Sequence, residues 1–332
     1  MGTDRPGEFE LIRTYFAPLA RDPGSLGLTD DAAVLTPGDG LDLVLTKDVL
    51  AANVHFFADD APEAIAAKAL RVNLSDLAAK GARPRGYLLG LALPSDWTSE
   101  WLGRFCDGLA ADQSAFDIQL LGGDTIRSGN GLQVSITAIG EVKVGGAVRR
   151  SGARPGDKIF VSGTIGDAAA GLKARLDTGF AAMHGFSRAD EKHVLDRYLL
   201  PRPRTRLADA ISASASAAMD ISDGLIADCR HMAGASCVDI IIEQEKVPLS
   251  EAMQKLKATA PDVFAKCING GDDYEILASV PVESETGFLK LAASAGCPVV
   301  EIGVVREGTG QVHLYRNGSP VDLKLEDGFR HF

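Results

Sequence analysis

Residues 217–228 read AAMDISDGLIAD, and this stretch indicates how the second half of the chain is built. An apolar run typical of a buried strand ends at Asp220, and a polar turn then leads into an apolar helix. A carboxylate directly after a buried strand is expensive unless it is paired, hydrogen-bonded or bound to a cation. Asp223 is equally explained as the N-cap of the helix, because aspartate is among the commonest N-cap residues. The stretch therefore predicts an α/β fold with a functional strand end at Asp220.

Similar acidic motifs recur where other strands are predicted to end. They are TDD at 29–31, TKD at 46–48 and GGD at 122–124, and GGDDYE at 270–275 precedes another predicted strand. Glycines let backbone amides approach a phosphate, and carboxylates hold the magnesium that accompanies it. Together the motifs predict a phosphate-handling enzyme, although a glycine-rich turn with a solvated aspartate would explain any one of them alone.

Length and composition limit the classes of protein to consider. The 332 residues suggest two domains, and the content of 45% hydrophobic and 24% charged residues is ordinary for a globular protein. A formal net charge of −11 argues against general nucleic-acid binding, which needs a basic surface. No stretch reaches the roughly 18 apolar residues needed to span a bilayer, and the amino terminus lacks a continuous apolar core. We expect a cytoplasmic protein that binds neither nucleic acid nor membrane.

The five cysteines are odd in number and widely spaced, and they form no Cys-x-x-Cys pair. We interpret them as reduced thiols in the core. The familiar P-loop, protein-kinase and dinucleotide-binding glycine signatures do not occur in the sequence. If the chain transfers phosphoryl groups, it does so on another fold.

Apolar periodicity and turn residues predict the order of elements. A helix is expected over 7–20, then two strands, AAVLT and LDLVLTKDVL, joined by a hairpin turn at 37–40, and then a helix over 62–80 that begins with proline and stops at Gly81. The turn-rich, basic segment 149–157 suggests a boundary between domains 1–148 and 149–332. In the second domain, helices alternate with predicted strands at KIFVSG, SAAMDIS, VDIIIE, YEILASV and VVEIGVV.

Two further polar residues lie close to these motifs. Asp76 lies inside the 62–80 helix, where a solvated stripe or an ion pair with Lys80 would explain it equally well. His55 follows the second strand, and a lone histidine is more often structural than catalytic. Any functional role for either residue depends on its neighbours in space.

Nine motifs, in this order along almost the whole chain, resemble the thiamine-monophosphate kinase family, whose superfamily also includes aminoimidazole ribonucleotide synthetase and selenophosphate synthetase. The motifs are GEFELI, LTDDAAVL, LTKDVLAANVHF, KALRVNLSDLAAKGA, LLGGDTIR, RRSGARPGD, MDISDGLIAD, GGDDYEIL and GFRHF. GGDDYE and the aromatic tail favour this kinase family over its relatives.

The resemblance implies a two-domain α/β protein of the aminoimidazole ribonucleotide synthetase-like fold, with an N-terminal mixed sheet that pairs in a homodimer and a C-terminal α/β domain. It implies magnesium-assisted, direct in-line transfer of a phosphoryl group from ATP to thiamine phosphate, and catalysis is expected to depend most on Asp48 and Asp124. Positions matching the family's metal ligands are Asp31, Thr46, Lys47, Asp48, Asp76, Asp124, Asp220 and Asp223. Positions matching its ATP contacts are Gly123, Asp124, Arg150 and Ser222, and those matching its substrate contacts are His55, Asp272 and Phe329.

Three residues depart from the family pattern. Lys47 replaces a threonine or another small residue, Thr29 replaces a glycine, and Asp272 replaces a glutamate. A protonated lysine cannot ligate magnesium, so Lys47 offers only its backbone or points its ammonium group at phosphate.

Two other functions remain open at this point. A relative within the superfamily would use ATP to activate an amide or carbonyl oxygen, whereas selenophosphate synthesis is less favoured because the early glycine-rich segment has no cysteine. A catalytically silent nucleotide-binding or thiamine-phosphate-binding protein would keep the pocket but form no ADP, and Lys47 is the feature that keeps this alternative open.

Overall fold

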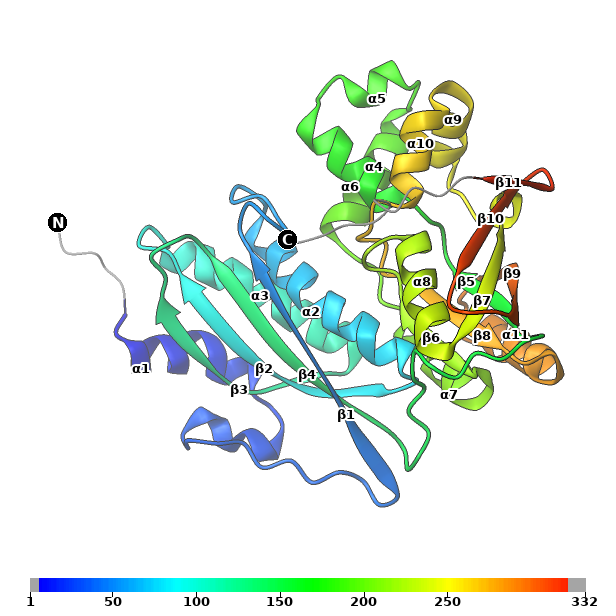
Figure 1. The fold of residues 1–332 in the computed structure, drawn as a ribbon. Coiled ribbons are helices and arrows are strands. Elements are labelled where there is room, and N and C mark those ends of the chain that lie inside the picture. Colours follow the sequence, from blue (N-terminus) through cyan, green and yellow to red (C-terminus); the bar gives the residue numbers. More distant parts are fainter. Residues whose placement is uncertain (1–5, 322–332) are drawn as a thin grey trace. The chain divides into compact units, whose positions relative to one another are not determined.

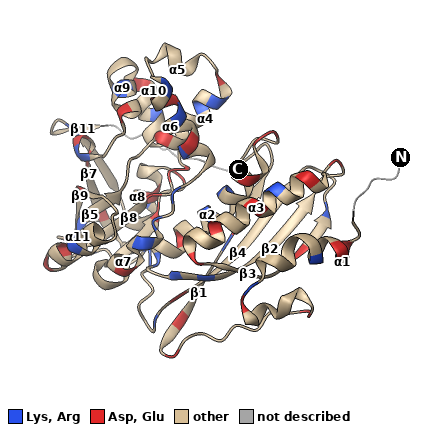
Figure 2. Ribbon diagram, turned by 180° about the vertical axis from the view of Figure 1, so that it is seen from behind, with Lys and Arg blue, Asp and Glu red and all other residues tan. Residues whose placement is uncertain are grey.

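The computed structural model describes residues 6–321, and contacts divide them into two compact units (Figure 1). The first unit holds the described residues up to Leu77 together with Arg83–Gly145. The second holds Ala78–Ala82 and the described residues from Gly146 onward. Acidic and basic residues are both distributed over the elements of the two units (Figure 2).

The first unit is built on a four-stranded mixed sheet. Its strands are β1 (Leu41–Ala51), β2 (Arg83–Leu93), β3 (Gln119–Arg127) and β4 (Gln133–Lys143), in the order β1-β4-β2-β3. β4 is antiparallel to both β1 and β2, whereas β2 and β3 are parallel. A parallel pair needs a long crossover, which α3 (Ser99–Phe116) supplies. Helices α2 (Pro62–Ala79) and α3 cover one face of the sheet (Figure 1).

The predicted helix over 62–80 is confirmed as α2. Proline stands at its first position, where the missing N–H costs nothing, and Gly81 follows its end with a positive φ of 71°. Ile65, Leu70 and Leu74 are buried residues of the helix itself, so packing adds to the helix propensity of its alanines.

The opening segment is helical, as expected over 7–20. It consists of α1 (Glu8–Leu11), a π-helical turn, η1 (Ile12–Phe16), and a 3₁₀ turn, η2 (Ala17–Leu19); a further 3₁₀ segment, η3 (Pro23–Leu28), follows. The strand predicted at 32–36 is wrong. The backbone there bonds locally, with the Val34 N–H donating to the Gly24 carbonyl, and β1 takes β4 as its partner instead. The composition of residues 37–40 is typical of a hairpin turn, but the strand that pairs with β1 is β4, which is distant in the sequence.

The second unit contains a seven-stranded sheet in the order β11-β10-β7-β9-β5-β8-β6. Among the described strands of this second sheet, only β7 and β10 pair in parallel. The bounds are β5 (Lys158–Ser162), β6 (Ala217–Asp220), β7 (Val238–Glu243), β8 (Ile276–Val280), β9 (Val299–Glu307), β10 (Val312–Arg316) and β11 (Ser319–Val321). The predicted strands at KIFVSG, SAAMDIS, VDIIIE, YEILASV and VVEIGVV are confirmed as β5 to β9.

Helices pack around this sheet. They are α4 (Asp167–Leu176), α5 (Phe180–Met183), α6 (Arg188–Leu199), α7 (Ala208–Ser214), α8 (Leu225–Ser236), α9 (Glu251–Thr259), α10 (Pro261–Ile268) and α11 (Glu285–Ser294), with 3₁₀ turns η4 (Thr205–Leu207), η5 (Gln244–Lys246) and η6 (Val282–Ser284). The main core joins apolar residues of β5, β6, β7, α4 and α8, including Ile159, Val161 and Ile226. Burial of this apolar surface is the main stabilising contribution to the unit.

All five cysteines are free, and four of them are buried, as expected. Cys237 is the exception, because it is exposed at the left-handed C-cap of α8. None of the helices in the described part of the chain combines the length and apolar character needed to cross a membrane.

Candidate active site

A cavity of about 720 Å³ lies in the first unit and brings together three of the predicted ligand motifs. Asp30 and Asp31 line it from the opening segment, Lys47 lines it from β1, and Gly122–Thr125 lines it from β3. Apolar side chains, among them Phe16, Leu28 and Leu88, complete the wall. A concave site with apolar walls and a few convergent charges is what a small phosphorylated ligand requires.

The glycines of the GGD motif allow a close approach of two backbones. The motif lies in the middle of β3 and not at the strand end where we expected it. Gly123 pairs with Leu89 of β2, and a β-carbon on Gly123 would overlap the Leu89 carbonyl oxygen. The bare backbone of Gly122 and Gly123 also lines the cavity. The long-range pairing of β2 with β3, which the sequence does not reveal, extends the strand through the motif.

Lys47 and Asp124 lie on the same face of the sheet. Lys47 pairs with Thr137, and Gly90 pairs both with Ser135 and with Asp124, which places their side-chain positions on one face. The Lys47 ammonium group donates to Ser135 Oγ at 2.6 Å and to Thr137 Oγ1 at 3.5 Å. The atypical lysine therefore contributes a positive charge to the wall of the cavity.

Thr46, Asp48 and Asp76 form a second group, on the helix-covered face of the same sheet. Thr46 and Asp48 flank Lys47, so their side chains point away from it toward α2. The Thr46 hydroxyl donates to Asp76 Oδ2, and the Asp48 N–H donates to Asn73 Oδ1 at 3.2 Å. Asp76 thus faces β1 and is not simply part of a solvated stripe. β1 runs on to Ala51, so Asp48 also lies within a strand and not near its end.

The pKa of Asp48 shows that its negative charge is disfavoured in this group. Burial, and then the negative charge of Asp76, raise the pKa of Asp48 to about 6. Partial burial and a neighbouring negative charge both disfavour the ionised form of a carboxyl group. The group consists of oxygen donors only, which is the donor set that magnesium and calcium prefer. These residues therefore fit a hard divalent cation.

Asp31 is exposed in the loop that follows η3, and Thr29 precedes it. The Thr29 backbone has a φ of −108°, which any residue adopts, and its hydroxyl donates to the Leu26 carbonyl at 2.8 Å. The substitution of threonine for the family's glycine therefore places no strain on this loop.

His55 lies just after β1 with a fixed ring orientation. Its Nδ1 accepts the Ala51 N–H at 3.1 Å, so the neutral ring carries its proton on Nε2. The His55 carbonyl accepts from Nζ of Lys68 at 2.8 Å, and Lys68 is only 1% exposed. A buried lysine thus ties the His55 backbone to α2.

In the second unit, Asp220 ends β6 and is buried, and the turn 221–224 leads into α8. The alternative that Asp223 is an N-cap is wrong. Gly224 holds the N-cap position with a φ of 115°, and no side chain caps the helix. Ser222 and Asp223 are therefore half-buried residues of the turn and serve no capping role.

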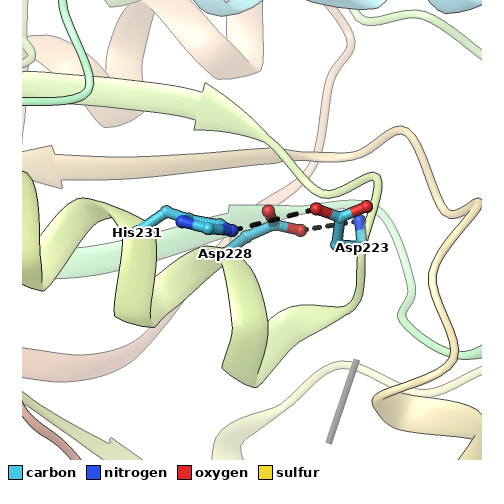
Figure 3. Close-up of side chains that lie close together, drawn as sticks. All are labelled: Asp223, Asp228 and His231. Atoms are coloured by element: carbon cyan, nitrogen blue, oxygen red, sulfur yellow. Dashed lines mark hydrogen bonds and ion pairs between the residues drawn. The ribbon is translucent and has the colours of Figure 1, made fainter. Parts of the chain in front are cut away.

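Asp228 and His231, which sequence reasoning missed, lie beside Asp223 (Figure 3). Asp228 Oδ2 accepts the Asp223 N–H at 3.1 Å, and His231 Nε2 lies 3.8 Å from Asp223 Oδ2. One potential ligand atom from each of the three residues lies within 4.8 Å of the others. Burial, and then the Asp223 charge, raise the pKa of Asp228 to about 7. The Asp-x-x-His spacing on one helix was the signal that could have revealed the pair.

Asp272 belongs to a turn that lies against this segment. Its backbone is left-handed, with a φ of 63°, and its N–H donates to the Ser222 carbonyl at 2.8 Å. Arg150 is exposed in the loop before β5, and Phe329 lies outside the described residues. The predicted residues therefore fall into the cavity group (Asp31, Lys47, Gly123 and Asp124), the helix-face group (Thr46, Asp48 and Asp76), and the 220–223 segment with its neighbour Asp272.

The two units match two known domain families. The model described as AIR synthase related protein, N-terminal domain, matches residues 29–142, and the C-terminal domain model matches residues 154–315. Together they cover most of the chain. The class is therefore that of the AIR synthase related proteins, with two α/β domains.

Curated relatives and solved structures narrow the class to one family. A thiamine-monophosphate kinase of Caulobacter vibrioides is 44% identical over 95% of this chain and 88% of its own length, and that of Escherichia coli K12 is 38% identical over 98% of both. The crystal structure of the Stenotrophomonas maltophilia thiamine-monophosphate kinase is 38% identical, with a TM-score of 0.82, and covers 97% of this chain and 99% of that one. The chain belongs to the thiamine-monophosphate kinase family and is a phosphotransferase.

Two further solved structures share this fold. AaThiL complexed with AMPPCP and TMP is 34% identical, with a TM-score of 0.75, over 100% of this chain and 99% of that one. The hydrogenase maturation protein HypE in complex with ATP is 20% identical, with a TM-score of 0.77, over 98% of this chain and 97% of that one, and shows the fold alone.

Proposed function

We propose that this chain transfers the terminal phosphoryl group of ATP to the phosphate of thiamine phosphate, giving thiamine diphosphate and ADP. The observation that carries the proposal is the cavity where Lys47, Asp31, Asp124 and the bare Gly122–Gly123 backbone meet, in a chain of this family. A related kinase has been crystallised with the nucleotide analogue AMPPCP and TMP. Phosphoryl transfer depends mainly on alignment and charge neutralisation, which such a cavity supports.

The cavity group is suited to the phosphates of the nucleotide. The Lys47 ammonium group is a point charge that attracts a phosphate oxygen, and the glycines leave the strand backbone open to the ligand. Gly123 and Asp124, with Arg150 and Ser222, are the proposed ATP contacts. The nucleophile is an oxygen of the substrate's own phosphate, which is ionised near neutral pH, so no protein general base is required.

Magnesium is the proposed metal, held by oxygen ligands. Asp31, Thr46, Asp48, Asp76, Asp124, Asp220 and Asp223 are the proposed side-chain ligands, and Lys47 offers only its backbone. The raised pKa of Asp48 supports a cation beside it, because a cation relieves its repulsion with Asp76. When bound, magnesium neutralises phosphate charge. His55, Asp272 and Phe329 are the proposed contacts with thiamine phosphate.

The decisive experiment incubates the purified protein with ATP, magnesium and thiamine phosphate and measures thiamine diphosphate by mass spectrometry. Asp124→Asn is the matched control, since it keeps the side-chain volume and removes the charge. Formation of thiamine diphosphate by the parent and its loss in the variant support the proposal. Binding without ADP formation would instead favour a silent binding protein, and ADP formation without thiamine diphosphate would favour a relative that activates another oxygen.

We further propose that the protein is a cytoplasmic homodimer that pairs through its first unit. Leu45, Val49, Leu88 and Ile126 lie on the open face of the four-stranded sheet and are between 39% and 62% exposed. Apolar side chains gathered on one face favour a protein partner, and a second copy is the partner that the family implies. Sedimentation should show a dimer for the parent and a monomer for Leu45→Lys. Val282→Lys, an exposed position in the second unit, is the control that should remain dimeric.

A further inference from the structure

Two segments of the second unit that carry proposed ligand contacts, 220–224 and 271–275, are held together by backbone hydrogen bonds. Strands β6 and β8 are paired antiparallel as far as Asp220 and Ile276. Beyond that pair the ladder continues, because the Ile221 N–H donates to the Glu275 carbonyl and the Tyr274 N–H donates to the Ile221 carbonyl, both at 2.8 Å. The Asp272 N–H then donates to the Ser222 carbonyl, also at 2.8 Å. The turn 271–275 is thus held against the segment 220–224.

The backbone of the turn 271–275 is strained. Gly271 has a φ of 80°, Asp272 of 63° and Tyr274 of 50°. Residues with a β-carbon adopt this left-handed conformation at a cost, and it persists only where the surroundings impose it. Something in the structure must therefore hold Asp272 and Tyr274 in place.

Glycines keep the two segments at backbone contact. A β-carbon on Gly271 would overlap the Ser222 carbonyl oxygen, and one on Gly224 would overlap the Asn269 carbonyl oxygen. Gly271 can take no side chain unless the turn moves away from the 220–224 segment, and Gly224 can take none unless Asn269, just before the turn, moves away.

Glu275, at the end of the turn, is the anchor. It is 0% exposed, and its carboxylate accepts from Ser162 Oγ at 2.6 Å and from Arg197 Nη2 at 2.9 Å. It also accepts from Nε and Nη2 of Arg204 at 2.6 and 2.5 Å. Removing one partner of such a buried ion pair leaves an uncompensated charge, so the arrangement is sensitive to each member.

The same network holds the middle of the turn. Nη2 of Arg197 also donates to the Asp273 carbonyl at 2.7 Å. The Asp273 carboxylate accepts from the Gly166 and Ala168 N–H groups, at 2.8 and 3.4 Å, where α4 begins. Arg197 and Asp273 are 2% and 1% exposed, so both contacts are shielded from water. The turn is therefore fixed from two sides by buried groups.

We propose that Glu275, together with Arg197 and Arg204, is a positioning residue that imposes the left-handed turn and holds Asp272 in register with Ser222 and Asp223. This inference rests on the proposed function, in which Asp272 meets thiamine phosphate while Ser222 and Asp223 meet the nucleotide and its cation. Glu275 acts through the turn, because its own side chain is buried. Changing it alters the binding of both ligands together.

The kinetic test compares Glu275→Gln with Asp239→Asn. The first variant keeps the volume of the side chain and removes the anchoring charge. The second removes a carboxylate that binds His313 and the backbone of 309–311, away from the turn. We expect Glu275→Gln to raise KM for thiamine phosphate about tenfold or more and KM for ATP about threefold, while Asp239→Asn lowers the melting temperature and changes each KM by less than about twofold. A Glu275→Gln variant with a lower melting temperature and both KM values unchanged would overturn the proposal.

Amide hydrogen exchange in the ligand-free protein tests the same claim without any activity. The Asp272 and Tyr274 amides should exchange about tenfold faster or more in Glu275→Gln, while the Val161 amide in β5 should keep its protection. If Glu275→Gln does not fold, Ser162→Ala removes two hydrogen bonds, the one that Ser162 Oγ donates to Glu275 and the one that it accepts from the Ile276 N–H, and leaves the ion pairs. It should accelerate the exchange of the same two amides about threefold. Unchanged protection of both amides contradicts the proposal. A parent protein that is inactive but shows this exchange pattern refutes the proposed function and leaves the positioning role standing.

Discussion

Asp48 and Asp124, the two aspartates on which catalysis is expected to depend, lie on opposite faces of one four-stranded sheet. Asp124 lies on the open face with Lys47 and lines the cavity. Asp48 points to the other face, where its backbone bonds Asn73 of α2 and Asp76 raises its pKa. The two carboxylates are therefore in different environments, and their replacement should have different consequences for stability and metal binding.

Replacing Asp124 by asparagine should lower turnover with ATP and magnesium by at least about 100-fold, because it removes a proposed anionic ligand of the magnesium that would neutralise the phosphate charge. The fold should be unaffected, since Asp124 is exposed on its strand. Circular dichroism and melting curves check the fold, and steady-state kinetics check the rate. Turnover within a few-fold of the parent would remove Asp124 from the site.

The raised pKa of Asp48 predicts how stability without metal depends on pH. Below the ordinary carboxyl pKa of about 4, Asp48 is protonated both folded and unfolded, so it has no effect. As pH rises from about 4 to about 6, the unfolded chain loses the proton more readily, and the folded protein is destabilised. The full cost, on the order of 3 kcal/mol, is reached above the folded pKa.

Melting curves in chelator between pH 4 and 7 measure this effect. Asp48→Asn should flatten the decline, because the neutral amide does not titrate, and it should be more stable than the parent at pH 7 without metal. Magnesium should restore the parent and release protons near pH 6. An identical pH profile for parent and variant would show that Asp48 is not the titrating group.

Much of the fold could be predicted from local sequence. The helix α2 follows from proline at its start, alanines within it and glycine after it, and β5 to β9 follow from short apolar runs between turns. The strand expected at 32–36 does not form. Composition predicts a turn at 37–40, but it does not predict which strand pairs with β1. Likewise, GGD at 122–124 was expected after a strand, whereas pairing with β2 carries β3 through it.

The candidate site was harder to predict for the same reason. Lys47 meets Ser135, 88 residues further along the chain, and this contact depends on the register between β1 and β4. Because side chains alternate between the two faces of a strand, the sequence predicts that Lys47 and Asp48 point to opposite faces of the sheet. It does not predict which of the two faces α2. The sequence did not reveal that Asp228 and His231 lie close to Asp223. Their proximity depends on the positive φ of Gly224, which sets the direction of the chain at the start of α8.

The position of Lys47 in the cavity wall predicts a role in binding the nucleotide. Lys47→Met keeps a long side chain and removes the charge, and should raise KM for ATP about tenfold with little change in KM for thiamine phosphate. Lys143→Met, at the end of β4, is the matched control and should leave both KM values unchanged. If Lys47→Met matches the parent at low ionic strength, where the charge acts most strongly, the ammonium group does not meet the phosphates.

Replacing His55 by alanine should weaken the binding of thiamine phosphate and affect the rate at saturation much less. The imidazole presents Nε2–H as a donor because Nδ1 is occupied by the Ala51 N–H. Losing one such hydrogen bond to a charged ligand should raise KM about tenfold. Kinetics with both substrates varied provide the test, and a variant changed mainly in kcat would place His55 among the reacting groups.

Gly122 and Gly123 are neighbours in β3, but we expect an added methyl group to affect the stability of the protein very differently at the two positions. In Gly123→Ala the new β-carbon would overlap the backbone oxygen of Leu89, so β2 and β3 would have to separate. A loss of about 2 kcal/mol or more in the free energy of unfolding is expected, because backbone cannot relax as a side chain can. In Gly122→Ala the nearest atom is the tip of the exposed Leu88 side chain, at 3.3 Å, which can rotate away. Urea titrations of the two variants should therefore differ clearly, and equal stabilities would show that the backbones of β2 and β3 are not in close contact at Gly123.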